Sequence, residues 1–302
     1  MSKWPDSLER LRGTVGVWTS THDALPAARS GEVALELEAL GYSAMWIPEA
    51  WGREAFTSSG LLLAATSTLT IATGIANIWA RDAVSTVNAA KTLNAAYDDR
   101  FVLGLGVSHR PLVERLRGHE YAAPRAAMAN FLSAMDAAPM HAAEAQQRYA
   151  RVIAALGPKM LALGATMTDG VHPYLVTPEH TALARAAVGD KFVGVEQSVV
   201  LGQSREEFLN RAHAHLEFYT GLENYRNNWR RLGFGDEDFV RGGSTRLCDA
   251  LVVHGDEAAV LHAIDAHRAA GADHVCLQVL GTDHTPVPRD EWRRLAPALM
   301  GS

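Results

Sequence analysis

Short hydrophobic runs alternate with longer amphipathic segments along the whole chain, which predicts strands followed by helices. Most of the short runs are continuously apolar, as is typical of strands covered on both faces of a sheet. The pattern therefore favours a parallel sheet. The predicted strands are Thr14–Thr19, Ala44–Pro48, Leu69–Asn77, Phe101–Val107, Arg151–Leu156, Val171–Val176, Phe192–Leu201 and Val275–Leu280.

The segments between these runs carry the signals that begin and end helices. Thr177 is a candidate N-cap before Pro178, and Asp256 is another. Gly271 follows the last such segment, where a glycine commonly ends a helix. The predicted helices are Pro26–Leu40, Ala83–Tyr97, Pro124–Ala137, Lys159–Thr168, Pro178–Val188 and Glu257–Ala270.

Repeated strand–helix units imply parallel strands joined by right-handed crossovers. Eight units over this length favour an α/β fold of the (β/α)8 TIM-barrel type over an open doubly wound sheet. Between the seventh and eighth predicted strands, Ser204–Leu232 is predicted to form two extra helices, within an insertion over about 204–239. We expect this insertion to pack over the C-terminal mouth of the barrel or on a partner subunit. The whole chain, 1–302, is predicted to be a single domain.

Composition narrows the class of protein. The chain has 302 residues, 48% hydrophobic and 21% charged, which excludes disorder for most of it. A net charge of -6 without a basic run gives no support for a nucleic-acid or anionic-membrane partner. Cys248 and Cys276 are far apart and fit a reducing compartment. The N-terminus has no signal-peptide pattern and the apolar stretches are shorter than the ~20 residues of a membrane span, so we expect a cytoplasmic protein.

Several well-known motifs are absent. The glycines of Leu103–His109 follow a predicted strand, but a dinucleotide fingerprint would need a third glycine where His109 stands. Two interpretations stay open: small residues here let a ligand approach the backbone, or they let the strand pack tightly against a helix. A Gly-x-Ser-x-Gly elbow fails because position 110 is Arg. His213 and His215 are two residues apart and would face different sides of a helix, so we expect no metal site.

Polar side chains follow the predicted strands at the edge where barrel active sites are built. An acid, an amide and an imidazole lie there, together with a helix N-terminus suited to an anion. More polar groups gather at this edge than the packing of a barrel requires. They are Glu49, Asn77, Ser108, His109, Tyr174, Thr177 and the loop 155–159, together with Glu196 and Gln197, which lie within the seventh predicted strand.

Five stretches together resemble one family over about Thr14–Leu299. The chain is similar to luciferase-like oxidoreductases of the bacterial luciferase superfamily, and specifically to the branch that uses the deazaflavin coenzyme F-420. The stretches that carry the resemblance are Trp46–Glu49, Ala72–Asn77, Phe101–Gly106, Ala154–Met160 and Pro173–Thr181.

The resemblance implies a cofactor site. It places a non-prolyl cis peptide at Gly74–Ile75, a bulge that presses on the coenzyme ring, and it places the acid Glu49 near that ring. The loop 155–158 matches the one whose backbone holds the coenzyme phosphate. The implied cofactor-binding residues are Thr73, Gly74, Ile75, Asn77, Gly106, Ser108, Ala155, Leu156, Gly157, Pro158 and Tyr174.

The chain departs from the family's sugar-phosphate dehydrogenases at two positions. Those members carry a catalytic His where this chain has Ala50, and a Glu where it has His109. A sugar phosphate is therefore not favoured as substrate, and we expect Glu49 and His109 to be the catalytic residues. The alternative for His109 is that it only holds its loop. Trp51 and Tyr174 are expected to wall the site.

The resulting expectation is an oxidoreductase that transfers a hydride between coenzyme F-420 and a small organic substrate. Two alternatives remain open: an FMN-dependent monooxygenase of the same fold, and a non-catalytic flavin- or ligand-binding barrel. The family resemblance and the uncharged helical face near Ala83–Ala96 favour a homodimer. The sequence leaves the substrate and the direction of reaction open.

Overall fold

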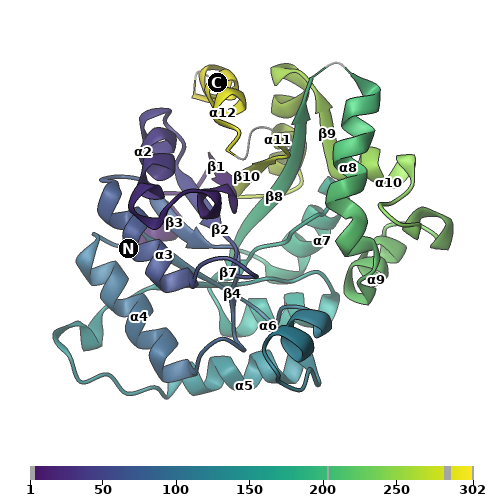
Figure 1. Cartoon of the computed structure of the whole chain (residues 1–302). Coiled ribbons are helices and arrows are strands. Elements are labelled where there is room, and N and C mark those ends of the chain that lie inside the picture. The colour runs from purple at the N-terminus through teal and green to yellow at the C-terminus, as the bar shows by residue number, and fades with distance from the viewer. Residues whose placement is uncertain (1–3, 203, 282–286, 301–302) are drawn as a thin grey trace.

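The computed structural model describes residues 4–202, 204–281 and 287–300. Within them, eight parallel strands close a barrel because β10 pairs with both β1 and β8, as the sequence predicted (Figure 1). In order around the barrel these are β1 Thr14–Trp18, β2 Ala44–Ile47, β3 Thr70–Thr73, β5 Phe101–Gly106, β6 Ala150–Ile153, β7 Gly170–Val171, β8 Phe192–Leu201 and β10 His274–Val279.

The predicted strand Leu69–Asn77 is two strands, β3 and β4 (Ala76–Asn77), interrupted at Gly74 and Ile75. A cis peptide bond joins these two residues, at the position that the family resemblance implied. The interruption stays attached to β2, since the Gly74 amide donates to the Ile47 carbonyl at 2.7 Å. On its far side the Glu49 amide donates to the Ile75 carbonyl at 3.1 Å.

Two further strands, β7 and β9 (Val252–Gly255), differ from the prediction. The strand predicted over Val171–Val176 is only β7, because Pro173 has no N–H for a ladder and Leu175 has a left-handed φ of 53°. The sequence analysis missed β9, which pairs in parallel with the C-terminal end of β8. β9 directly follows a short helix, so the pattern offers no separate apolar run bounded by turns.

Helices surround the barrel (Figure 1). α7 has the predicted bounds, whereas the predicted helix Pro26–Leu40 divides at Ser30 into a 3-10 turn and α2. The α-helices are α1 Asp6–Glu9, α2 Gly31–Ala39, α3 Ala55–Ala65, α4 Ala83–Ala96, α5 Pro124–Asp136, α6 Pro158–Met167, α7 Pro178–Val188, α8 Arg205–Thr220, α9 Glu223–Arg231, α10 Thr245–Leu251, α11 Glu257–Ala269 and α12 Arg289–Met300.

α1, α3, α10 and α12 were not predicted. α3 contains Ser, Thr and Gly, which are poor helix formers, and its start is fixed by Glu54, whose carboxylate accepts from the Phe56 and Thr57 amides. Asp256 caps α11 as predicted, through the Ala259 amide. Thr177 precedes α7, but its side chain makes no capping hydrogen bond.

α8 and α9 occupy most of the segment 204–232 and have an apolar core of their own against β8. Phe208 and Leu216 of α8 and Trp229 of α9 are completely buried there. A separate cluster, including Trp46 and Phe192, fills the barrel interior. Because α8 and α9 are anchored by their own core, they form a fixed wall beside the barrel mouth.

Candidate functional site

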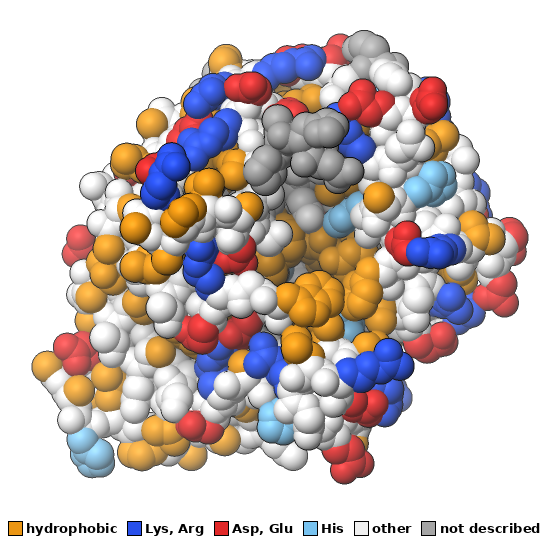
Figure 2. Space-filling view, viewed as in Figure 1, with side chains coloured by type: hydrophobic (Ala, Val, Ile, Leu, Met, Phe, Trp, Pro, Cys, Tyr) orange, Lys and Arg blue, Asp and Glu red, His pale blue; other side chains and the backbone are white. Residues whose placement is uncertain are grey.

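A cavity of about 760 Å³ opens at the C-terminal ends of the barrel strands. This volume is within the range of small-molecule sites. Its lining comes from the segments that follow six barrel strands, from the end of β10, and from α8 and α9. Figure 2 shows a hollow in this face bordered by hydrophobic side chains. Aromatic members of the lining are Trp18, Trp51, Tyr121, Tyr174, Phe218, Tyr219 and Tyr225.

Most residues that the sequence analysis assigned to a site line this cavity. They are Glu49, Gly74, Ile75, Gly106, Ser108, His109, Ala155, Leu156, Gly157 and Tyr174.

Thr73, Asn77 and Pro158 lie outside the lining. The Thr73 hydroxyl donates to the Gly104 carbonyl at 2.7 Å and accepts from the Gly104 amide, so it ties β3 to β5. The backbone N–H of Asn77 donates to the Glu49 carboxylate at 2.8 Å. Pro158 is the first residue of α6. These three residues support the site from behind rather than facing its interior.

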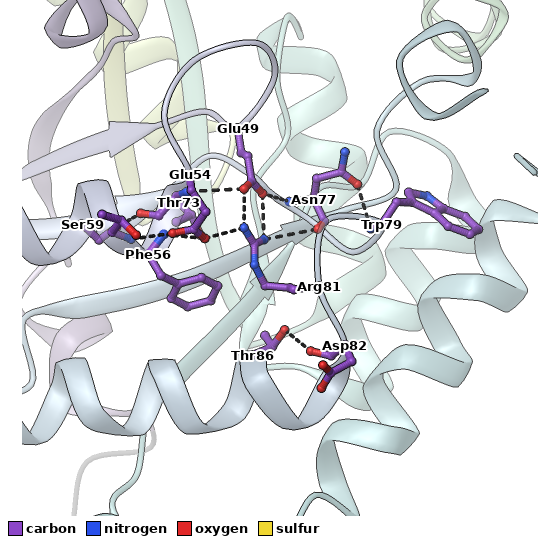
Figure 3. A network of polar contacts seen from close by, with 12 residues as sticks. Glu49, Glu54, Phe56, Ser59, Thr73, Asn77, Trp79, Arg81, Asp82 and Thr86 are labelled. Atoms are coloured by element: carbon purple, nitrogen blue, oxygen red, sulfur yellow. Dashed lines mark hydrogen bonds and ion pairs between the residues drawn. The ribbon is translucent and has the colours of Figure 1, made fainter. Parts of the chain in front are cut away.

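Glu49 is held as a fixed anion at the cavity edge. Arg81 donates to both of its carboxylate oxygens and donates to Glu54 at 2.6 Å (Figure 3). The Asn77 and Ala55 amides complete the shell around the Glu49 carboxylate. A carboxylate with both oxygens bound this way is held in one orientation and is organised to orient neighbouring groups.

The cavity floor combines the Gly74–Ile75 bulge with two side chains of the barrel interior. The Trp18 indole donates to the Gly74 carbonyl at 2.9 Å. His172 donates from Nδ1 to the Gly194 carbonyl, and its Nε2 has no partner among the described residues. Burial lowers the pKa of His172 to about 4, so the neutral ring carries a free acceptor nitrogen on the floor.

The opposite end of the cavity is suited to an anion. The loop 154–157 leads into α6, whose first residue is Pro158, so the positive end of the helix dipole faces the lining residue Gly157. His180 fixes this loop by donating from Nε2 to the Leu156 carbonyl at 2.9 Å. Arg231 of α9 adds a guanidinium, 3.6 Å from where a Cβ on Gly157 would lie.

His109 lies on the aromatic wall, with its ring 5.8 Å from the rings of both Phe218 and Tyr225. Burial lowers the pKa of His109 to about 4. The ring is therefore uncharged at neutral pH. Within the described part of the chain it makes no side-chain hydrogen bond.

The sequence predicted two extra helices, α8 and α9, but assigned no site residue to them. Arg231, His215, Phe218, Tyr219 and Tyr225 all line the cavity. The first three lining residues of α8 are spaced i, i+3 and i+4, which places them on one helical face and could have marked a functional surface. Of the two placements expected for the extra helices, the structure shows the one at the barrel mouth.

The model of the family "Luciferase-like monooxygenase" matches residues 13–274. The chain belongs to this family. A putative coenzyme F-420-dependent oxidoreductase of Mycobacterium tuberculosis is 30% identical over 112 residues, covering 37% of this chain and 31% of that protein. The match therefore spans about a third of the relative's length.

Solved structures share the fold at low identity. An F-420-dependent secondary alcohol dehydrogenase in complex with an F-420–acetone adduct has a TM-score of 0.73 and 13% identity, over 95% of this chain and 99% of that one. The oxygenating constituent of a 3,6-diketocamphane monooxygenase from Pseudomonas putida, in complex with FMN, has a TM-score of 0.65 and 14% identity, over 95% and 96%. The neighbours thus include enzymes of both cofactor types.

The described residues contain no group of three or more His, Cys, Asp and Glu side chains placed to hold a metal ion. None of the helices in the described ranges has the length and apolarity needed to cross a membrane. Cys248 and Cys276 are both buried free thiols.

Proposed function

We propose that this protein is a coenzyme F-420-dependent oxidoreductase acting on a small organic substrate. The main support for the proposal is that one cavity contains both the Gly74–Ile75 bulge, at its floor, and an anion-binding end at Gly157 and Arg231. A planar ring bearing a phosphorylated chain needs both features. The relative from M. tuberculosis and the alcohol dehydrogenase neighbour support the same choice.

The residues present fit such a cofactor. The free Nε2 of His172 is an acceptor that a ring N–H would satisfy, and an orphaned buried acceptor is costly without such a partner. Arg231 and the α6 N-terminus would hold the phosphate. A bound deazaflavin would supply a hydride-carrying carbon. The protein's part is to seat the ring, exclude water and position the substrate beside it.

Glu49 and His109 keep the catalytic assignments proposed from the sequence, with narrower roles. Glu49, fixed by Arg81, would orient the ring or the substrate electrostatically. His109, neutral in its aromatic surroundings, would contact the substrate as a hydrogen-bond donor or acceptor. We further propose a cytoplasmic, single-domain homodimer, with the α4 surface around the exposed Val84 as part of the contact.

An FMN-dependent monooxygenase is the second candidate, because a neighbour of the same fold is in complex with FMN. The anion-binding end would serve the FMN phosphate equally well. Discrimination between the two cofactors rests on few ring contacts, so binding must be measured.

The anion-binding end is tested with Arg231→Gln, followed by quenching of tryptophan fluorescence. Affinity for coenzyme F-420 should fall by more than tenfold, since the phosphate loses a charged partner. Affinity for riboflavin, which has no phosphate, should be unaffected by the substitution. Arg230→Gln is the matched control, because Arg230 is the preceding residue of α9 but pairs with Glu223 and Asp236 outside the cavity. Equal effects of the two substitutions would contradict the assignment.

A further inference from the structure

A buried carboxylic group is connected to the cavity wall through two side chains. Glu196 of β8 is completely buried. Its Oε1 accepts from the Ser198 hydroxyl at 2.7 Å, and its Oε2 accepts from the Leu175 amide at 3.0 Å. The Ser198 hydroxyl in turn lies 3.3 Å from Nε2 of His215 on α8. His215 lines the cavity, so an unbroken polar chain runs from the barrel wall to the site.

The neighbouring polar groups on this wall are already engaged with one another. The Tyr174 hydroxyl donates to Gln278 Oε1 at 2.7 Å and accepts from the Tyr219 hydroxyl at 3.1 Å. Within the described residues, Nδ1 of His215 has no hydrogen-bond partner. His215 is therefore the group on this wall with a ring nitrogen available to a ligand.

Burial disfavours the charged forms of both Glu196 and His215. Burial raises the pKa of Glu196 to about 7 and lowers the pKa of His215 to about 4. The groups that face Glu196 are Tyr174 after β7, Tyr219 of α8, Tyr225 of α9 and Cys276 of β10, and burial raises the pKa of each of them. None of these groups is a cation, so no ion pair stabilises the carboxylate form of Glu196 over its protonated form.

We propose that Glu196, Ser198 and His215 form a proton relay that delivers or removes the proton accompanying hydride transfer in this cavity. The proposal rests on the proposed function for its reaction and names His215, rather than His109, as the group that exchanges the proton with substrate. Within the described residues, the His109 side chain makes no hydrogen bond to a comparable proton source.

The relay balances in both directions without an imidazolium. For carbonyl reduction, the substrate oxygen would take the proton from His215 Nδ1, and the carbonyl carbon would take the hydride that a deazaflavin supplies when bound. His215 Nε2 takes the Ser198 proton, and Ser198 takes the proton of Glu196, which becomes a carboxylate. For alcohol oxidation every transfer reverses and Glu196 ends protonated. Because burial disfavours a charged ring, His215 passes the proton by changing its tautomer.

The connection is tested first on the protein without cofactor, by nitrogen-15 NMR of the histidine rings. The ring-nitrogen shifts of His215 should change with a midpoint near pH 7 as Glu196 ionises and the tautomer changes. Glu196→Gln and Ser198→Ala should each abolish that step. Ser58→Ala is the matched control, because Ser58 contacts a different buried histidine, His22, at 3.1 Å. A His215 signal without the step, or a step that survives Ser198→Ala, would overturn the relay.

Turnover gives the second readout, with carbonyl compounds that the wild type reduces using coenzyme F-420. His215→Gln and Glu196→Gln should lower kcat by about 100-fold or more, the usual size of general acid catalysis. Coenzyme affinity should stay within about twofold of wild type, and the wild-type fall of kcat above pH 7 should vanish in Glu196→Gln. The exposed His262→Gln is the control for a histidine change as such.

Retention of kcat within about threefold in both relay variants would overturn the proposal. If the wild type binds no deazaflavin, the proposed function fails instead. The NMR titration distinguishes that failure, since it needs no cofactor.

Discussion

Arg81 and Glu49 form a bidentate ion pair that is nearly buried, with the Arg81 side chain 10% exposed and the Glu49 side chain 4% exposed. The Arg81 side chain joins the segment after β4 to the segment after β2, and it also reaches Glu54 at the start of α3 (Figure 3). The Asn77 and Ala55 amides complete this shell around Glu49. The pair therefore fixes the position of a cavity-lining carboxylate relative to the bulge.

Arg81→Ala should destabilise the protein by about 3–5 kcal/mol, because it leaves the Glu49 carboxylate buried without a counter-charge. The measurement is the free energy of urea unfolding. Arg29→Ala is the control, since Arg29 pairs with Glu32 at an exposed site and should change stability little. Similar small effects for both substitutions would show that the Glu49 pair is not structurally important.

Gly74→Ala should weaken coenzyme binding by well over tenfold. A Cβ at this position would lie 2.8 Å from Trp18 Nε1 and 3.0 Å from His172 Nε2, so the cavity floor would have to shift. Gly60→Ala is the matched control. Gly60 lies within helix α3, and a Cβ there would meet only Leu93, at an ordinary contact distance of 3.7 Å. Binding is followed by tryptophan quenching, and unchanged affinity in Gly74→Ala would exclude the bulge as the seat of the ring.

His109→Ala should reduce turnover more than it reduces coenzyme affinity, since the ring lies on the aromatic wall of the cavity, beside Phe218 and Tyr225, where we propose that the substrate binds. The loss should be smaller than that of His215→Gln, because burial keeps the His109 ring neutral and no hydrogen-bonded proton source contacts it among the described residues. Steady-state kcat and coenzyme titration separate the two effects. A larger loss of affinity than of turnover would make His109 a cofactor-binding residue.

Stability should fall as the pH decreases from about 6.5 to 4. His172, His267 and His274 are buried with pKa lowered to about 4, 4 and 3, so the unfolded chain binds more protons than the folded one in this window. Each group contributes a slope of about 1.4 kcal/mol per pH unit. Between pH 4.5 and 7, Glu196 offsets the slope of one of these histidines, because Glu196 keeps its proton in the folded state and loses it in the unfolded state.

Urea unfolding at several pH values checks this dependence. His172→Gln should flatten the slope by about one proton, whereas the exposed His262→Gln should not change it. A stability that is independent of pH over this window, or that rises as pH falls, would contradict the proposed ionisation states.

The barrel could be predicted because strands buried on both faces carry continuous apolar runs, such as Phe101–Gly106. The strand–helix pattern placed the loop around Gly157 at the barrel mouth, before a helix N-terminus. The cis peptide and the phosphate-binding role of that loop followed only from the family resemblance. Elements held by tertiary contacts were missed. β9 is ordered by pairing with β8, and the position of Arg231 at the α6 N-terminus depends on how α9 packs.

The sequence also could not predict the ion pairing and the charge of individual site residues. The sequence placed Glu49 and His109 at the barrel mouth correctly, but it contained no sign that Arg81 would occupy both oxygens of Glu49. The pKa of His109 also depends on burial by α8 and α9, which are distant in the sequence. Sequence patterns indicated which groups gather, and the folded surroundings determine their charge.

The most direct test of the central claim is a parallel titration of the cofactor-free protein with coenzyme F-420 and with FMN, followed by tryptophan quenching. We predict micromolar binding of coenzyme F-420 and much weaker binding of FMN. Tight FMN binding with weak binding of coenzyme F-420 would contradict it and place the protein with the FMN-dependent monooxygenases.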